Sequence, residues 1–209
     1  MIIPSFYPAM AGAETQLKRI SSNLIKQGWS VIVLTRRHDN ILPQNLPKYE
    51  ILDNIPIVRV NSRGNGKWGA LAFSLNAIWF LINNGRKSIY HAHDLGSASW
   101  IAIIAKFLLN GWSVIKLRGD EHHHKKMMKG KLSFIKYKLT LYMTDIILTV
   151  CQSVNLLMKN ELKNSSKKVR TVLNGVDIND FSPVDIKTKI DLRHEINLPL
   201  KKIIILYVG

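Results

Sequence analysis

The chain has 209 residues, enough for one large domain or for one domain and part of another. Hydrophobic residues make up 46% and charged residues 21%, as in ordinary folded proteins, and the single cysteine, Cys151, excludes an internal disulfide. Thirty Lys and Arg against 14 Asp and Glu leave a net charge of +16, which predicts attraction to nucleic acid, anionic lipid or sugar nucleotides. A general lysine bias over a solvated surface would explain the same charge.

Strand-like and helix-like segments alternate along the chain. A short strand at 1–3 leads through an irregular loop to a helix that begins near Gly12 and ends at Gly28. The later elements expected are strands at 29–35, 55–60, 88–92, 112–117, 145–151 and 169–173, and helices at 70–82, 96–109, 131–143 and 153–162. This alternation predicts an α/β fold with a Rossmann-like, doubly wound parallel sheet.

The most apolar run, 70–82, is shorter than the roughly 20 residues that span a bilayer, so a buried helix is expected there. No secretory signal pattern is visible, and a cytoplasmic protein is expected. After Pro183 the composition shifts to a charged helical linker at 185–197 and then an apolar strand at 202–209. A buried parallel strand needs cover on both faces. We therefore expect a domain at 1–183, and at 184–209 a linker with the first strand of a further domain absent from the chain; the short first strand also suggests that residues precede Met1.

Gly12 stands between the first strand and the first helix. A glycine there lets backbone N–H groups approach a phosphate at the positive end of the helix. Gly12 and Ala13 are therefore candidates for phosphate binding. The alternative is a helix start that binds no ligand.

Two further candidates follow strand ends, where ligands bind in open α/β sheets. The strand at 88–92 contains His91 and is followed directly by His93 and Asp94. The sequence supplies no further ligand to complete a metal site there, so no metal is predicted. Arg118 and Gly119 end the strand at 112–117, and the guanidinium could clamp a phosphate at two points. The alternative is an Arg118 that is ion-paired with a neighbouring carboxylate, Asp120 or Glu121.

Histidines at 122–124 cannot all face one ion from a regular element, and the lysines that follow repel cations, so no metal is predicted here either. From Lys116 to Lys138 there are eight Lys or Arg against two acids. In the helix at 131–143, one apolar stripe can pack on the sheet: Leu132, Ile135, Leu139 and Tyr142. A second stripe lies among lysines, as in helices that dock on membranes: Phe134, Tyr137 and Leu141. The membrane-facing candidates are Lys131, Phe134, Tyr137 and Lys138; the alternative is a helix packed on two sides inside the protein.

The string at 171–183 ends the last strand at Asn174 and Gly175, a pair that tolerates positive φ. Asp177 can cap a helical turn, and Phe181 is expected to be an apolar anchor. This N-G-V-D-x-x-x-F-x-P string resembles the segment that closes the first domain of family 4 glycosyltransferases of the GT-B fold. The opening loop, the His-x-His-Asp strand end and the strand before Gln152-Ser153 follow the same family's order.

The resemblance implies the N-terminal half of a two-domain GT-B enzyme that transfers a sugar, with retention, from a nucleotide-sugar donor to a glycan or lipid-linked acceptor. It implies that the absent domain binds the donor, that the loop at Gly12 faces the diphosphate, and that His93 lines the sugar pocket. Asn174 and Gly175 join the substrate-binding candidates through their string. Ala11 replaces a family glycine and Arg118 a family histidine, so roles specific to those residues do not carry over.

Further expectations follow from the same resemblance. No cofactor or metal is needed, and the role would be in polysaccharide biosynthesis, with peripheral contact at the inner face of an anionic membrane. The chain alone is expected to be inactive. Other readings are an inactive fragment, a stand-alone binding module that needs a partner chain, or a basic nucleic-acid-binding protein; the last rests on charge alone, and nucleic acid is not expected as a partner.

Overall fold

The computed structural model describes residues 1–9, 11–37, 46–63, 66–119, 124–126, 128–176, 178 and 181–206. The chain divides into two compact units, Met1–Asn174 and Gly175–Gly209. The boundary predicted from the sequence, after residue 183, lies inside the second unit and stays a prediction.

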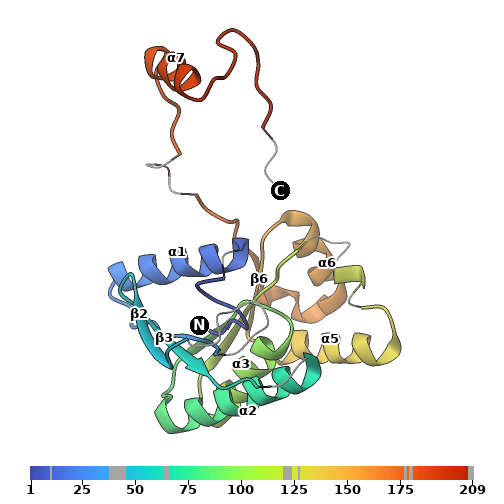
Figure 1. The fold of residues 1–209 in the computed structure, drawn as a ribbon. Helices are drawn as coiled ribbons and strands as arrows, with labels where there is room; N and C mark the ends of the chain where they lie inside the picture. Colours follow the sequence, from blue (N-terminus) through green and yellow to red (C-terminus); the bar gives the residue numbers. More distant parts are fainter. Residues whose placement is uncertain are drawn as a thin grey trace. The chain divides into compact units, whose positions relative to one another are not determined.

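The first unit is built on a sheet with helices on both faces (Figure 1). Its strands are β1 (Val33–Arg36), β2 (Tyr49–Leu52), β3 (Ile55–Val60), β4 (Ile89–Ala92), β5 (Trp112–Lys116), β6 (Ile146–Thr149) and β7 (Val169–Thr171). They pair in the orders β1-β3-β2 and β4-β5-β6-β7, and Ile2 bridges both groups through Leu34 and Ala92. Every pairing is parallel except that of the edge strand β2, which the sequence did not indicate.

The helices are α1 (Gly12–Lys26), α2 (Gly66–Asn84), α3 (Ser97–Leu108), α5 (Lys131–Met143) and α6 (Gln152–Leu162), with a 3₁₀ turn at Lys163–Lys168. In Figure 1, α1 lies across one face of the sheet, and α2 and α3 lie across the other. Alternate strand residues enter different cores. Ile3, Val33 and Ile57 pack with Leu17 of α1, whereas Ile2, Leu34 and Val58 pack with Phe73 of α2. These strands are continuous apolar runs in the sequence because both of their faces are covered.

Helix α2 corrects the expectation of a buried helix at 70–82. It is longer than predicted, and only Gly69, Phe73 and Ala77 are buried. Large apolar side chains are exposed along its opposite face: Trp68, Leu71, Leu75, Trp79 and Ile82. A helix that is apolar all round cannot be oriented from its sequence, because no polar stripe marks the solvent side.

Helix α5 has the predicted bounds, but its two stripes are exchanged. Tyr137 and Leu141 are buried, and Tyr137 contacts His124 through a 3.0 Å hydrogen bond. The stripe expected to pack on the sheet is exposed instead: Leu132, Ile135, Leu139 and Tyr142. Tyr137 is therefore wrong as a membrane-facing candidate. Lys138 pairs with Glu161 of α6, while Lys131 and Phe134 are exposed.

The second unit contains one described helix, α7 (Ile186–Glu195). Asp185 caps it by accepting a 2.9 Å hydrogen bond from Thr188 N, which confirms the charged helical segment. In the segment predicted as a strand at 202–209, residues 203–206 form no strand and Ile203 is exposed, while residues 207–209 lie outside the described residues. Phe181, expected to be an apolar anchor, is also exposed.

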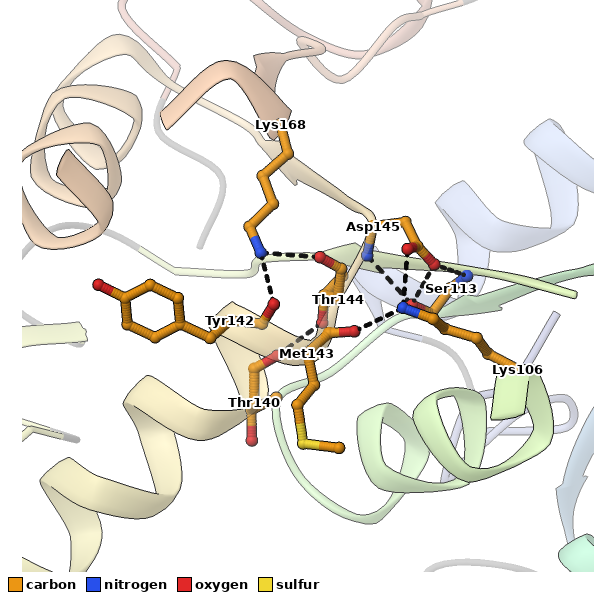
Figure 2. Close-up of polar contacts among 8 residues, drawn as sticks. All are labelled: Lys106, Ser113, Thr140, Tyr142, Met143, Thr144, Asp145 and Lys168. Atoms are coloured by element: carbon orange, nitrogen blue, oxygen red, sulfur yellow. Dashed lines mark hydrogen bonds and ion pairs between the residues drawn. The ribbon is translucent and has the colours of Figure 1, made fainter. Parts of the chain in front are cut away.

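At the amino ends of β5 and β6, a polar network holds the end of α5 (Figure 2). Asp145 accepts hydrogen bonds from Lys106 Nζ at 2.7 Å and from Ser113 N at 2.8 Å and Oγ at 2.9 Å. Lys106 Nζ also donates to Met143 O, and Lys168 Nζ to Tyr142 O and Thr144 O. The two lysines thus satisfy carbonyls that a helix end leaves without internal partners. Burial opposes ionisation of Asp145, but its hydrogen bonds from Lys106 and Ser113 outweigh burial and hold the pKa of the carboxyl below its ordinary value.

Candidate functional site

The strand order places a switch point between the Ile2 segment and β4. From Ile2 the chain goes first to β1 and β3 on one side, and later to β4 and β5 on the other. Loops that leave adjacent strands in opposite directions at such a point open a crevice at the carboxyl edge, where α/β proteins bind ligands. The loop before α1 and the residues after β4 both leave the sheet at this edge.

His91 and His93 lie at the end of β4, with their ring centroids 4.4 Å apart. Neither Nε2 atom has a hydrogen-bond partner among the described residues. Burial lowers the pKa of His91 to about 3 and the pKa of His93 well below its ordinary value, and nearby positive charges such as Lys116 add to the effect. Both imidazoles are therefore neutral at pH 7, and each can donate one hydrogen bond and accept another.

Lys116 is the residue that the sequence reasoning did not single out. Its side chain is buried at the end of β5, and burial lowers the pKa of its amine. Removing a charged amine from water is costly. One sequence signal could have found Lys116. It is a charged residue inside the strand at 112–117, which was otherwise expected to be covered on both faces.

Arg118 follows β5 directly and pairs with Asp94, at 3.4 Å between Nη2 and the nearer carboxylate oxygen. The structure thus brings three predicted residues, His93, Asp94 and Arg118, to one edge. Gly119 has φ +80°, a conformation that favours glycine, and turns the chain away after Arg118. Asp120 and Glu121, the ion-pair partners considered from the sequence, lie outside the described residues.

At the start of α1, Gly12 and Ala13 occupy the first helical turn, and the N-cap residue Ala11 provides no side-chain hydrogen bond. A Cβ on Gly12 would meet open space, so its backbone faces an accessible region. Glu14 of the same turn is buried, and one of its carboxylate oxygens has no partner within the described chain. The sequence motifs did not single out Glu14.

Asn174, the last residue of the first unit, accepts a hydrogen bond from Gln16 Nε2 of α1. This contact brings the first residue of the N-G-V-D string beside the first helix. Gly175 belongs to the second unit and is not placed relative to the first. Asp177 lies outside the described residues.

The chemistry of this edge suits a polar, negatively charged ligand. Arg118 and Lys116 provide positive charge, the uncapped turn of α1 provides backbone N–H groups, and His93 provides a neutral imidazole for a hydroxyl group. Within the described part of the chain, no cluster of three or more His, Cys, Asp or Glu could hold a metal ion. Of the helices described, none is long and apolar enough to cross a bilayer.

A parallel sheet with this switch point and this carboxyl edge defines a Rossmann-like domain of the kind that binds nucleotides. The sequence profile described as Glycosyltransferase Family 4 matches residues 10–180. The chain therefore belongs to glycosyltransferase family 4, as the sequence motifs predicted. No curated protein matches it.

Two similar solved structures are of Anabaena HepE, one in complex with UDP and glucose and one with UDP-glucose. The first has a TM-score of 0.61 at 17% sequence identity and is matched over 94% of this chain and 49% of its own. The second has a TM-score of 0.59 at 16% identity, with coverage of 94% and 48%. The similarity confirms the predicted α/β fold of the GT-B type, and the chain spans about half the length of these structures.

Proposed function

We propose that this chain is the N-terminal, acceptor-side half of a retaining glycosyltransferase, which transfers a sugar from a nucleotide-sugar donor to a glycan or lipid-linked acceptor. Membership of family 4 supports the reaction class. The presence of UDP-glucose in the HepE structure supports a nucleotide sugar as the donor. Because the chain spans about half of HepE, a second domain or partner chain would complete the donor site.

The observation that carries the proposal is the set of polar groups without partners at the switch point. The Nε2 atoms of His91 and His93 and one carboxylate oxygen of Glu14 have no hydrogen-bond partner among the described residues. Folded proteins seldom leave buried polar groups unpaired unless a ligand or water satisfies them. A sugar supplies hydroxyl groups that neutral imidazoles and a carboxylate oxygen can bind, and the diphosphate joined to it supplies the negative charge that Arg118 can bind.

We assign a role to each candidate. Arg118, beside Asp94, binds phosphate, and Lys116 adds positive charge behind it. His93, held neutral by burial, binds a sugar hydroxyl and is the candidate catalytic residue. The N–H groups of Gly12 and Ala13 approach the diphosphate at the start of α1. No cofactor and no metal take part in this scheme.

Titration of the 209-residue chain with UDP, UDP-glucose and glucose tests the donor assignment. We expect Arg118→Ala to weaken UDP binding about tenfold, because a charge-assisted phosphate contact is lost. Arg19→Ala, an exposed arginine on α1, is the matched control and should leave the affinity unchanged. Equal loss in the two variants would contradict the assignment. If the 209-residue chain alone binds no UDP, the same two variants are compared after the complementing second domain is added.

The same chain should show no transferase turnover alone, and turnover should appear when a complementing second domain is added. Product formation by the isolated chain would show that the site is complete without that domain. Tight binding of an RNA oligonucleotide, together with no response to UDP, would favour the nucleic-acid reading instead.

We also propose peripheral contact with an anionic membrane through α5. Its exposed stripe of Leu132, Ile135, Leu139 and Tyr142 runs beside Lys131 and Lys136, and the helix contains no acidic residue. Apolar side chains among lysines suit the interface of an anionic bilayer. A lipid-linked acceptor would be presented at such a surface.

Co-sedimentation with vesicles tests this contact. The double variant Leu132→Ser, Ile135→Ser should lose binding to phosphatidylglycerol vesicles, whereas Ile186→Ser in α7 should not. Leu132 and Ile186 have similar exposed fractions, 81% and 79%, so general surface hydrophobicity is matched. Retained binding in the double variant would refute the role of α5.

A further inference from the structure

A second hollow lies outside the candidate site, between α2 and the edge strand β2. Its volume is about 400 Å³, within the range of roughly 300–1,000 Å³ typical of ligand pockets. Its lining includes Arg37, Lys48, Tyr49, Asn76, Trp79 and Asn83. We refer to it as the α2–β2 groove.

Two aromatic side chains stand in this groove with much of their surface exposed. Tyr49 pairs with Val58, whose side chain packs against α2, so Tyr49 faces the same side of the sheet as the helix. Trp79 comes from α2 itself. Exposed aromatic faces on both sides of a groove can stack on the C–H faces of a pyranose ring, which the negative face of the aromatic ring attracts.

Amide groups line the helical side of the groove. Asn76 Nδ2 donates to Ala72 O at 2.8 Å and to Asn61 O at 3.1 Å, and Asn83 Nδ2 donates to Trp79 O at 2.8 Å. These bonds use the donor ends of the amides and hold the side chains in place. The amide oxygens are left as acceptors, which suit the hydroxyl groups of a sugar.

The charge of the groove is positive. Arg37 and Lys48 lie in its lining, and none of the described lining residues is acidic. Glu50, the next residue after Tyr49, points to the other face of the sheet, where it pairs with the buried Arg59. A ligand that carries carboxylate or phosphate groups therefore meets no described carboxylate here.

The position of the groove relates it to the candidate site. Arg37 and Asn61 directly follow β1 and β3, so one end lies at the carboxyl edge of the sheet. From there the groove continues along α2 as far as Asn84, the last residue of the helix. A chain that reacts at the carboxyl edge could thus lay its non-reacting sugars along the helix.

We propose that the α2–β2 groove binds an acidic oligosaccharide, the non-reacting part of the acceptor. This rests on the proposed function, because it names the acceptor class of the same enzyme. The aromatic faces would stack on sugar rings, the amide oxygens would accept hydroxyl hydrogen bonds, and Arg37 and Lys48 would bind the acidic groups.

Calorimetry on the 209-residue chain with a hexamer of galacturonic acid, with maltohexaose and with a uridine hexanucleotide tests the proposal. We expect the acidic hexamer to bind at least about tenfold more tightly than maltohexaose, because two cations discriminate between them. Equal affinity for the two sugars, or no binding of the acidic hexamer at about 10 mM, would overturn the proposal. So would tighter binding of the hexanucleotide that is lost in Trp79→Ala.

The helix itself provides a matched control. Trp79 and Trp68 are exposed to similar extents, 68% and 75%, but only Trp79 lines the groove. Trp79→Ala should weaken binding of the acidic hexamer about tenfold, as for loss of a stacked aromatic, and Trp68→Ala should not change it. Lys48→Gln should weaken the acidic hexamer and leave maltohexaose unchanged. An equal loss in the two tryptophan variants would overturn the proposal.

Failure here is separable from failure of the donor assignment. Trp79→Ala should leave UDP binding unchanged, because the residue is distant in sequence and element from Arg118 and His93. Arg118→Ala should leave binding of the acidic hexamer unchanged. A single variant that abolishes binding of both UDP and the acidic hexamer would show that the groove is not a separate site.

Discussion

The two edges of the sheet differ in how far their buried polar side chains are hydrogen-bonded. At the amino edge, Asp145, Lys106 and Lys168 each bond to several partners and hold the end of α5 (Figure 2). At the carboxyl edge, the Nε2 atoms of His91 and His93 are buried without partners among the described residues. A satisfied network stabilises the fold, whereas an unsatisfied one costs stability and is kept for a ligand. The difference supports the proposal that the carboxyl edge is the functional one.

The largest expected effect is at the amino edge. Asp145→Ala should lower the free energy of unfolding by about 3 kcal/mol, because Lys106 and Ser113 lose a shared partner in a partly buried setting. Urea denaturation measures it. Asp94→Ala at the carboxyl edge is the comparison and should cost only about 0.5 kcal/mol. Similar losses in the two variants would erase the contrast.

Acid should act through the buried imidazoles. The unfolded chain binds a proton at His91 near its ordinary pKa of about 6.5, but the folded chain does so only near pH 3. Stability is therefore complete above about pH 6.5 and falls as the pH drops toward 3, by about 1.4 kcal/mol per pH unit for one such group. His91→Gln should flatten this part of the stability curve. Curves for wild type and variant that stay parallel between pH 6.5 and 4 would refute the burial of a neutral His91.

Replacing a lysine should change the free energy of unfolding in opposite directions at the two edges of the sheet. Lys116→Met should raise the free energy of unfolding by about 1 kcal/mol, because burial disfavours the charged amine that the variant removes, and should weaken UDP binding. Lys168→Met should lower it by about 1 kcal/mol, because Tyr142 O and Thr144 O lose their donor. Thermal and urea unfolding of the pair check the signs, and destabilisation by both variants would mean that Lys116 is structural.

The smallest effect concerns the ion pair at the carboxyl edge. Arg118→Ala should change stability by no more than about 0.5 kcal/mol, because Arg118 and Asp94 are both partly exposed. Its effect should appear in UDP binding. A loss of stability comparable to that of Asp145→Ala would assign Arg118 to the structure rather than to the site.

Local pattern was sufficient for most of the sheet. The strand at Ile55–Val60 and the helix at Lys131–Met143 have the predicted bounds, since apolar runs and helical spacing are properties of neighbouring residues. The strand predictions failed where strand formation depends on pairing with a distant segment. The edge strand β2 exists only through its pairing with β3, and the apolar segment at 203–206 forms no strand and pairs with no described strand.

The motifs identified the family and named His93, Asp94 and Arg118, and the strand ends implied that these residues meet at one edge. The sequence could not show that Lys116 is buried, that the two histidines lack partners at Nε2, which apolar stripe of α5 is buried, or that α2 leaves a groove beside β2. Spacing along the chain determines which residues share a helix face or a strand end. Burial and hydrogen bonding depend on which distant segments arrive beside them, and only the tertiary structure decides that.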